Sequence, residues 1–149
     1  MNSYSLVEEY LVFKRYPSTL DIKIKKIEFL AQLRRNNGQF LLGSNGKFIQ
    51  INEFNSELPF IFGDFKTKNF FELKEAIDQT SFDYNQIKKL FFFKSGRWDI
   101  ETKNGLLVRL PKNKIDISLK MLINFLDQNK EQKLKEIDLR QHKQIIING

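Results

Sequence analysis

One stretch of this sequence leaves little choice of local structure. Two arms rich in strand-forming residues, 97–102 and 106–110, flank the dipeptide Asn104-Gly105. Asn-Gly is the strongest short signal for a β-hairpin, because both residues tolerate the positive φ that a tight turn between twisted strands requires. Pro111 ends the second arm, since proline cannot donate a hydrogen bond to a neighbouring strand. The stretch therefore predicts a hairpin in the middle of a mixed sheet.

The lone tryptophan, Trp98, lies in the first arm of this hairpin, close to the apolar run 87–93. We interpret residues 87–93 as apolar on both faces, which predicts a central strand covered on both sides. The three phenylalanines at 91–93 are interpreted as core rather than as a platform for stacking nucleic-acid bases. Trp98 is therefore expected to be buried.

Two helical patterns complete an α+β fold with a mixed, mostly antiparallel sheet and two main helices. Asn69 is expected to cap a helix that runs to Gln79, with Glu72 completing a capping box. The buried stripe of this helix consists of Phe70, Leu73 and Ile77. A second helix is expected over residues 115–127, with one apolar face formed by Ile115, Leu119, Leu122 and Leu126.

Short runs of β-branched and aromatic residues, separated by turn residues, predict the remaining strands. Before the hairpin these are residues 11–15, 20–25, 30–34, 39–42, 47–51 and 58–63. After the second helix they are residues 136–140 and 143–147, the last of which carries three consecutive isoleucines.

The composition indicates a globular protein without catalytic or metal chemistry. The chain has 149 residues, of which 41% are hydrophobic, and no run approaches the roughly 18 apolar residues of a membrane helix. Cysteine is absent and His142 is the one histidine, so thiolate metal sites and nucleophilic or proton-shuttle catalysis lack their usual residues. Asp and Glu could still act as a general acid and base, but they are scattered and no pair stands out. We expect no enzymatic activity, no cofactor and no metal, and keep an enzyme that uses carboxylates as a further alternative.

The net charge of +7 admits two interpretations. A solvated, lysine-rich surface is one, and a patch that binds nucleic acid or an anionic membrane is the other. Basic residues cluster at 23–26, 34–35, 66–68 and 88–89, but no predicted helix gathers them on one face. We favour the solvated surface and keep a basic nucleic-acid-binding domain as the alternative function.

Five motifs follow one another along the chain: Tyr16-Pro17-Ser18-Thr19-Leu20, Leu58-Pro59-Phe60-Ile61-Phe62-Gly63, Arg97-Trp98-Asp99, Asn104-Gly105-x-x-Val108-x-Leu110-Pro111 and Ile137-Asp138-Leu139-Arg140. The series resembles the extracytoplasmic part of the FtsQ/DivIB cell-division proteins. This resemblance implies that residues 1–27 are the C-terminal part of a POTRA domain and that residues 28–149 are the β domain of the family. It also implies a single-pass protein of the bacterial cytoplasmic (inner) membrane, anchored by an N-terminal helix missing from this chain, with this part on the periplasmic side.

The same resemblance implies a non-enzymatic divisome scaffold whose partners are FtsB-like and FtsL-like proteins. In the family, an FtsB-type partner adds a strand just after the Asp-Leu-Arg motif. Carried over to this chain, the partner-binding residues are Arg140, Gln141, Lys143, Gln144, Ile145, Ile146 and Ile147. An exposed sheet edge suits this role, because a partner strand satisfies its unpaired N–H and C=O groups.

Strand alternation divides the last predicted strand into two sets of side chains. Lys143, Ile145 and Ile147 point one way, and Gln144 and Ile146 point the other. The sequence leaves open which set meets the partner.

Asp138 and Arg140 share one face of the preceding predicted strand. We expect Asp138 to make an internal ion pair or hydrogen bond. For Arg140, an internal role and a partner contact both stay open.

Overall fold

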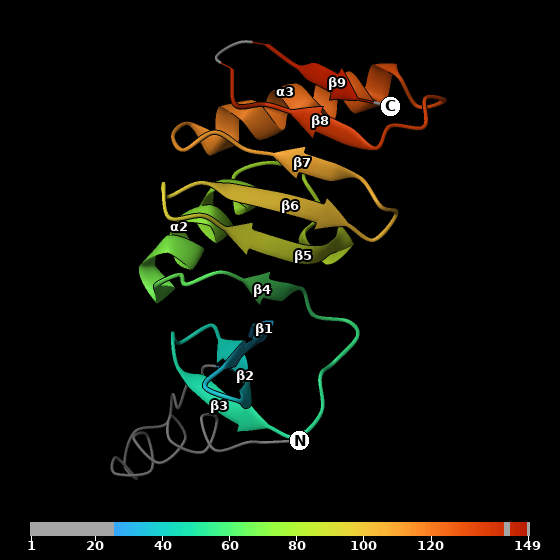
Figure 1. Ribbon diagram of the computed structural model, residues 1–149. Coiled ribbons are helices and arrows are strands. Elements are labelled where there is room, and N and C mark those ends of the chain that lie inside the picture. Colours follow the sequence, from blue (N-terminus) through green and yellow to red (C-terminus); the bar gives the residue numbers. More distant parts are fainter. Residues whose placement is uncertain (1–25, 142–143, 149) are drawn as a thin grey trace, which may run out of the picture. The chain divides into compact units, whose positions relative to one another are not determined.

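The computed structural model describes residues 26–141 and 144–148 (Figure 1). The chain divides into two compact units, residues 1–54 and 55–149. The strands expected over residues 11–15 and 20–25, the POTRA segment except for its last two residues, and Lys143 all lie outside the described residues.

The first unit contains a three-stranded antiparallel meander, which confirms the strands expected there. The strands are β1 (Phe29–Arg35), β2 (Gly38–Gly43) and β3 (Phe48–Ile51), with β2 between the other two. Asn36 and Asn37 link β1 to β2 with φ of 49° and 63°. Both residues of a two-residue loop in positive φ are the mark of a type I′ hairpin turn.

The second unit contains six strands in chain order across the sheet. They are β4 (Phe60–Phe62), β5 (Ile87–Phe92), β6 (Trp98–Thr102), β7 (Leu107–Arg109), β8 (Glu136–Asp138) and β9 (Ile146–Asn148). The pairs β4–β5 and β7–β8 are parallel, and the other three pairs are antiparallel. A parallel pair requires a crossover, and α2 (Thr67–Asp78) and α3 (Ile115–Gln128) provide the two crossovers. The predicted α+β fold with a mixed, mostly antiparallel sheet is confirmed.

The helix α2 begins earlier than its sequence pattern predicts. Lys66 occupies the N-cap position, and Asn69 lies inside the first turn, where its Oδ1 accepts a hydrogen bond from the Lys66 N–H at 2.9 Å. The expected capping box of Asn69 with Glu72 is therefore wrong, because Asn69 closes the helix start from the third helical position. The expected stripe is correct, since Phe70, Leu73 and Ile77 are at most 1% exposed.

The helix α3 matches its predicted range to within one residue. Leu119 and Leu122 are fully buried, whereas Ile115 and Leu126 at the two ends of the predicted face are half-buried. In Figure 1, α2 and α3 lie on the same side of the six strands, so one face of this sheet is covered and the other is open.

An apolar row crosses all six strands on the covered face. Its members pair successively through Ile61, Leu90, Ile100, Val108, Ile137 and Ile147. The first five are at most 3% exposed. Trp98 lies on the same face of β6 as Ile100, and its ring is 6.0 Å from Phe65, which in turn is 6.5 Å from Phe70 of α2. Each fully buried aliphatic side chain of this kind contributes about 1.5–3 kcal/mol through removal from water.

The open face shows that β5 is not covered on both sides, as its composition predicts. Lys89 and Phe91 point to this face and are half-buried, and Phe93 beyond the strand is 38% exposed. Phe92 points to the covered face, and its ring lies 4.8 Å from Trp98, but it is half-buried too. The expectation that the phenylalanines at 91–93 are core is therefore wrong, since none of the three is fully buried. The expectation of two covered faces is wrong because both helices lie on one side of the sheet.

The hairpin is formed by β6 and β7, but its turn differs from the expected one. Gly105 has φ of 90°, while Asn104 is not among the residues with positive φ. The Gly105 N–H donates to the Thr102 carbonyl at 3.0 Å, and the Thr102 N–H donates to the Leu106 carbonyl at 2.9 Å. The loop therefore has three residues and one left-handed glycine, the second commonest hairpin geometry.

Trp98 is 2% exposed and touches aromatic rings from β5 and from the segment before α2, which confirms that it is core. Trp98→Ala is expected to lower the free energy of unfolding by about 3–5 kcal/mol, since it leaves a large cavity. Urea denaturation followed by circular dichroism measures the change. Phe93→Ala, which truncates an exposed aromatic in the same hairpin region, is the control and should cost less than about 1 kcal/mol. Equal midpoints for Trp98→Ala and the unsubstituted protein would show that Trp98 does not support the core.

Candidate functional site

The last strand, β9, forms one edge of the six-stranded sheet. It spans Ile146–Asn148, so it starts three residues later than predicted and includes Asn148. It pairs antiparallel with β8, and no strand in residues 26–141 or 144–148 pairs with its outer side. Ile146 and Ile147 are 41% and 39% exposed. The structure thus places an accessible, uncharged strand at the edge where the sequence predicts partner binding.

The backbone directions at this edge follow from the neighbouring pair of strands. The Leu107 N–H donates to the Lys135 carbonyl at 2.9 Å, and the Leu139 N–H donates to the Arg109 carbonyl at 2.8 Å. Because backbone groups alternate sides along a strand, Ile137 and Leu139 face β7, while Glu136 and Asp138 face β9. At Lys135, just before β8, the C=O faces β7, and the N–H donates to the Asn148 carbonyl at 3.3 Å. Ile146 and Asn148, which pair with them, therefore turn their backbone groups inward. The N–H and C=O of Ile147 point away from the sheet, to the open edge.

The side chains of β9 divide between the two faces of the sheet. Ile147 is opposite Ile137 and ends the apolar row on the helix-covered face. Ile146 is opposite Asp138, and Asn148 is opposite Glu136, so both lie on the open face. Among the predicted partner-binding residues, Gln144 is exposed and Ile145 is half-buried just before the strand, and Arg140 and Gln141 are exposed just after β8.

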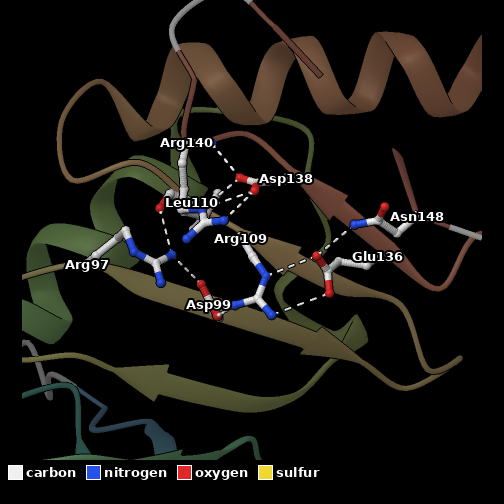
Figure 2. A network of polar contacts seen from close by, with 8 residues as sticks. All are labelled: Arg97, Asp99, Arg109, Leu110, Glu136, Asp138, Arg140 and Asn148. Atoms are coloured by element: carbon white, nitrogen blue, oxygen red, sulfur yellow. Dashed lines mark hydrogen bonds and ion pairs between the residues drawn. The ribbon is translucent and has the colours of Figure 1, made fainter. Parts of the chain in front are cut away.

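A network of ion pairs crosses the open face from β6 to β9 (Figure 2). Its centre is Asp99, a carboxylate on a residue that is 2% exposed. Arg97 Nη1 lies 2.5 Å from Asp99 Oδ1, and Arg109 Nη1 lies 3.1 Å from Asp99 Oδ2. Arg109 Nε also contacts Glu136 Oε2 at 3.1 Å, and Asn148 Nδ2 donates to the same oxygen at 3.1 Å. The edge strand is thereby connected to the buried centre of the sheet.

The ionised forms of Arg109 and Glu136 stabilise each other. Hydrogen bonding from Arg109 holds the pKa of Glu136 below its ordinary value, and Asn148 adds a second, smaller effect in the same direction. The hydrogen bond to Glu136 likewise raises the pKa of Arg109. Both groups are therefore charged at neutral pH, and the network persists there.

Asp138 and Arg140 form a compact ion pair next to this network. Asp138 accepts hydrogen bonds from the Arg140 backbone N–H at 2.9 Å, from Nε at 2.9 Å and from Nη2 at 2.6 Å. The expected internal contact of Asp138 is therefore present. The Arg140 side chain is still 46% exposed, so it can contact a partner while it stays paired.

A pocket of about 600 Å³ opens beside Arg140. Its walls come from the loop after β7, the first turns of α3 and the end of β8. The described residues that line it include three cationic side chains, Lys112, Lys114 and Arg140, and no carboxylate. Its apolar lining consists of Pro111, Ile117, Met121 and Leu139. Such a pocket suits an apolar group that carries a negative charge.

Within residues 26–141 and 144–148, no group of three or more His, Cys, Asp or Glu side chains could hold a metal ion. Over the same residues, no helix combines the length and the apolar character that crossing a bilayer demands. The fold and the site define a class of α+β proteins. In this class, helices cover one face of the sheet, the other face carries an ion-pair network, and the last strand is an accessible edge.

The sequence pattern of the family described as "Cell division protein FtsQ/DivIB, C-terminal" matches residues 31–140. The chain is 28% identical to the cell division protein FtsQ of Rickettsia prowazekii (strain Madrid E), over 95% of this chain and 54% of that protein. It is also 28% identical to FtsQ of Rickettsia bellii (strain RML369-C), over 90% of this chain and 51% of that protein. The chain belongs to the FtsQ/DivIB family of cell division proteins, and it spans about half the length of these curated relatives.

A solved structure shares the fold. It is the major extracytoplasmic domain of the trans isomer of the bacterial cell division protein DivIB from Geobacillus stearothermophilus. The TM-score is 0.51 at 12% sequence identity, with 73% of this chain and 99% of that chain covered. At this identity the likeness concerns the fold alone, and it agrees with the predicted α+β architecture.

Several residues of this site have no counterpart in the sequence-based predictions. The sequence predicts strands at Arg109 and Glu136 but no role for either side chain, and the predicted last strand ends before Asn148. The signal for Asn148 is its spacing, since it stands two residues after Ile146 and so continues the same face. No sequence signal joins Arg109 to Glu136, because they are 27 residues apart and meet through a parallel strand pair.

Asp138→Asn is expected to lower the free energy of unfolding by about 1–3 kcal/mol at neutral pH, because it removes a carboxylate that accepts hydrogen bonds from the Arg140 side chain and backbone. Urea titrations of both proteins measure the difference. Asp127→Asn, on the exposed surface of α3, is the control and should have little effect. If Asp138→Asn were as stable as the unsubstituted protein, the ion pair would have no structural role.

The same pair predicts a pH dependence. Hydrogen bonds from the Arg140 side chain hold the pKa of Asp138 below its ordinary value, so the unfolded chain takes up the proton first as the pH falls. The contribution of Asp138 to stability is complete above its unfolded pKa of about 3.9 and disappears as the pH falls through the lower folded value. The stability difference between the unsubstituted protein and Asp138→Asn should therefore shrink in acid. A difference that stayed constant or grew would contradict this assignment.

Proposed function

We propose that this chain is the periplasmic part of a non-enzymatic divisome scaffold, and that it binds an FtsB-like partner by strand addition at β9. Membership of the FtsQ/DivIB family supports a role in cell division. An FtsL-like protein is a further partner in this proposal. The protein is held at the bacterial inner membrane by an N-terminal helix of the full-length protein, and residues 1–27 complete a POTRA domain.

The observation that carries this proposal is the outward direction of the Ile147 backbone. Its N–H and C=O lie at an edge that no other strand in the described part of the chain covers. A strand in this position offers one donor and one acceptor to an incoming polypeptide, and pairing removes both from water. The neighbouring Ile146 and Asn148 hold the strand on β8, so binding does not require the sheet to open.

The cationic pocket provides a second contact for the same partner. It begins at Arg140, two residues after β8, so it lies within the same unit as the edge strand. A partner segment that follows its paired strand can place an acidic side chain near Lys112, Lys114 and Arg140. Electrostatic attraction of this kind speeds association and adds specificity more than it adds affinity.

The two buried carboxylates of the open face are paired with arginines. The buried carboxylate Asp99 is neutralised by two arginines, and Asp138 is neutralised by Arg140. Hydrogen bonds from the Arg140 side chain hold the pKa of Asp138 below its ordinary value, whereas proton transfer needs a pKa near the working pH.

Ile147→Pro is expected to weaken binding of the extracytoplasmic segment of the FtsB-like protein from the same genome by at least about tenfold. Proline removes the one outward N–H of β9, whereas the inward groups of Ile146 and Asn148 remain. Isothermal titration calorimetry measures the affinity, and circular dichroism establishes that the variant is folded. Ile147→Val keeps the N–H and the β-branched shape, so it is the matched control and should bind within about twofold. A folded Ile147→Pro variant with unchanged affinity would refute strand addition at β9.

Charge reversal in the pocket tests the second contact. Lys112→Glu is expected to weaken partner binding about tenfold at low salt, and the difference should shrink as ionic strength rises. Lys120→Glu makes the same charge change on an exposed position of α3 outside the pocket lining and is the control. Equal losses for the two variants would mean that net charge, and not the pocket, governs binding.

The alternative of nucleic-acid binding rests on the net charge of +7. Titration with duplex and single-stranded DNA at two salt concentrations separates the alternatives. Submicromolar affinity with a steep salt dependence would favour a nucleic-acid-binding domain over the scaffold.

A further inference from the structure

Three cross-strand rows end at β9, and their last residues differ in chemistry. The row on the covered face ends in Ile147, which follows Val108 and Ile137. On the open face, one row ends in Ile146 after Asp138, and the other ends in Asn148 after Glu136. A strand added to β9 extends all three rows by one residue each, because paired residues on neighbouring strands lie on the same face.

The row that ends in Ile147 favours an apolar residue on the added strand. Five residues of this row are buried beneath the helices, and Ile147 is 39% exposed at its end. The side chain that pairs with Ile147 covers this exposed remainder on the helix side of the sheet. A charged side chain there would be desolvated against an apolar row without a partner, which is costly.

The Asn148 row favours a hydrogen-bond donor. Asn148 Nδ2 donates to Glu136 Oε2 at 3.1 Å, and this contact fixes the orientation of the amide. Its Oδ1, an acceptor, makes no hydrogen bond within the described residues, and it is directed to the other side of the amide from Glu136. A donor on the incoming strand satisfies this oxygen, and a cationic donor also gains from the Glu136 carboxylate beyond it.

The Ile146 row is the third position. Ile146 is 41% exposed, and the Asp138 carboxylate behind it is already paired with Arg140. An apolar side chain opposite Ile146 removes apolar surface from water and meets no unpaired charge.

We propose that the strand accepted by β9 carries a three-residue pattern: a donor opposite Asn148, an apolar residue opposite Ile147 and an apolar residue opposite Ile146. The occupant is an extended polypeptide segment with lysine, arginine, asparagine or glutamine at the first position. This inference rests on the proposed strand addition and adds the chemistry that selects the strand. The pattern holds for either strand direction, because reversal changes the order of the three residues and not their pairing.

Two substitutions of Asn148 separate selection from a purely structural role. Asn148→Lys pairs with Glu136 and stabilises β9, but it replaces the acceptor with a cation that faces the incoming donor. Asn148→Asp places a second carboxylate beside Glu136 and destabilises β9, but it keeps an acceptor. A structural role predicts stronger partner binding for Asn148→Lys than for Asn148→Asp, and the proposed selection predicts the reverse order.

A library of displayed peptides tests the three-residue pattern directly. The probe is a set of extended segments of about eight residues, a common strand length, with randomised central positions. It is selected against the 149-residue protein and, in parallel, against its Asn148→Lys variant. In the selection against the unsubstituted protein, we expect hydrogen-bond donors at the position opposite Asn148, next to an apolar residue. In the selection against Asn148→Lys, we expect aspartate or glutamate at that position, with a change in relative enrichment of at least about tenfold.

The outcomes distinguish this inference from the proposed function. Selected segments are tested again on Ile147→Pro. Segments that lose binding to Ile147→Pro but show the same side-chain preferences on both targets would leave the docking edge in place and overturn the pattern. Segments that bind Ile147→Pro as well as the unsubstituted protein would overturn strand addition itself. Failure to enrich any segment would also count against the edge and, with it, the pattern.

Discussion

Burial of the apolar row between six strands and two helices is the interaction on which the rest of this unit depends. Ile61, Leu90, Ile100, Val108 and Ile137 come from five strands and are at most 3% exposed. Both helices lie on this side because both crossovers join strands that run in the same direction and advance the same way across the sheet, and such crossovers are right-handed. One-sided coverage leaves the second face of the sheet to solvent. Aromatic rings of β4 and β5 pack together on one part of that face, and polar contacts stabilise the part from β6 to β9.

The polar contacts on the open face form the ion-pair network around Asp99. An almost fully buried carboxylate is costly without partners, and Arg97 and Arg109 supply them from the two strands of the hairpin region. Arg109 continues to Glu136, and Glu136 continues to Asn148, so the chain of contacts ends at the edge strand. The position of β9, which has only three paired residues, is thus tied to the buried centre of the sheet around Asp99. Preorganisation of this kind lowers the entropic cost of docking a partner.

Local chemistry predicted the elements of this fold better than it predicted their environment. Trp98, and the stripe of Phe70, Leu73 and Ile77, were recognised because burial follows from periodicity within one element. The two-sided burial of β5 was wrong because the coverage of a strand depends on where the helices cross. The hairpin turn has one residue more than predicted, and the N-cap of α2 is Lys66, three residues before the predicted Asn69. Both differences arise because the same residues are compatible with several local backbone geometries. The pairing of Arg109 with Glu136 depends on the parallel β7–β8 contact, which no local pattern contains.

The edge strand β9 is accessible, but it is short. A long, flat and apolar edge would invite indiscriminate pairing, and shortness is one of the ways in which natural sheets avoid it. The backbone groups of Ile146 and Asn148 face β8, so within β9 only the N–H and C=O of Ile147 can bond to an added strand. Backbone hydrogen bonds alone therefore bind a partner strand weakly. Affinity must then come from side chains in the three rows and from contacts outside the strand, such as those of Arg140 and the cationic pocket. An edge of this kind discriminates between partners, because no segment gains enough from the backbone pairing by itself.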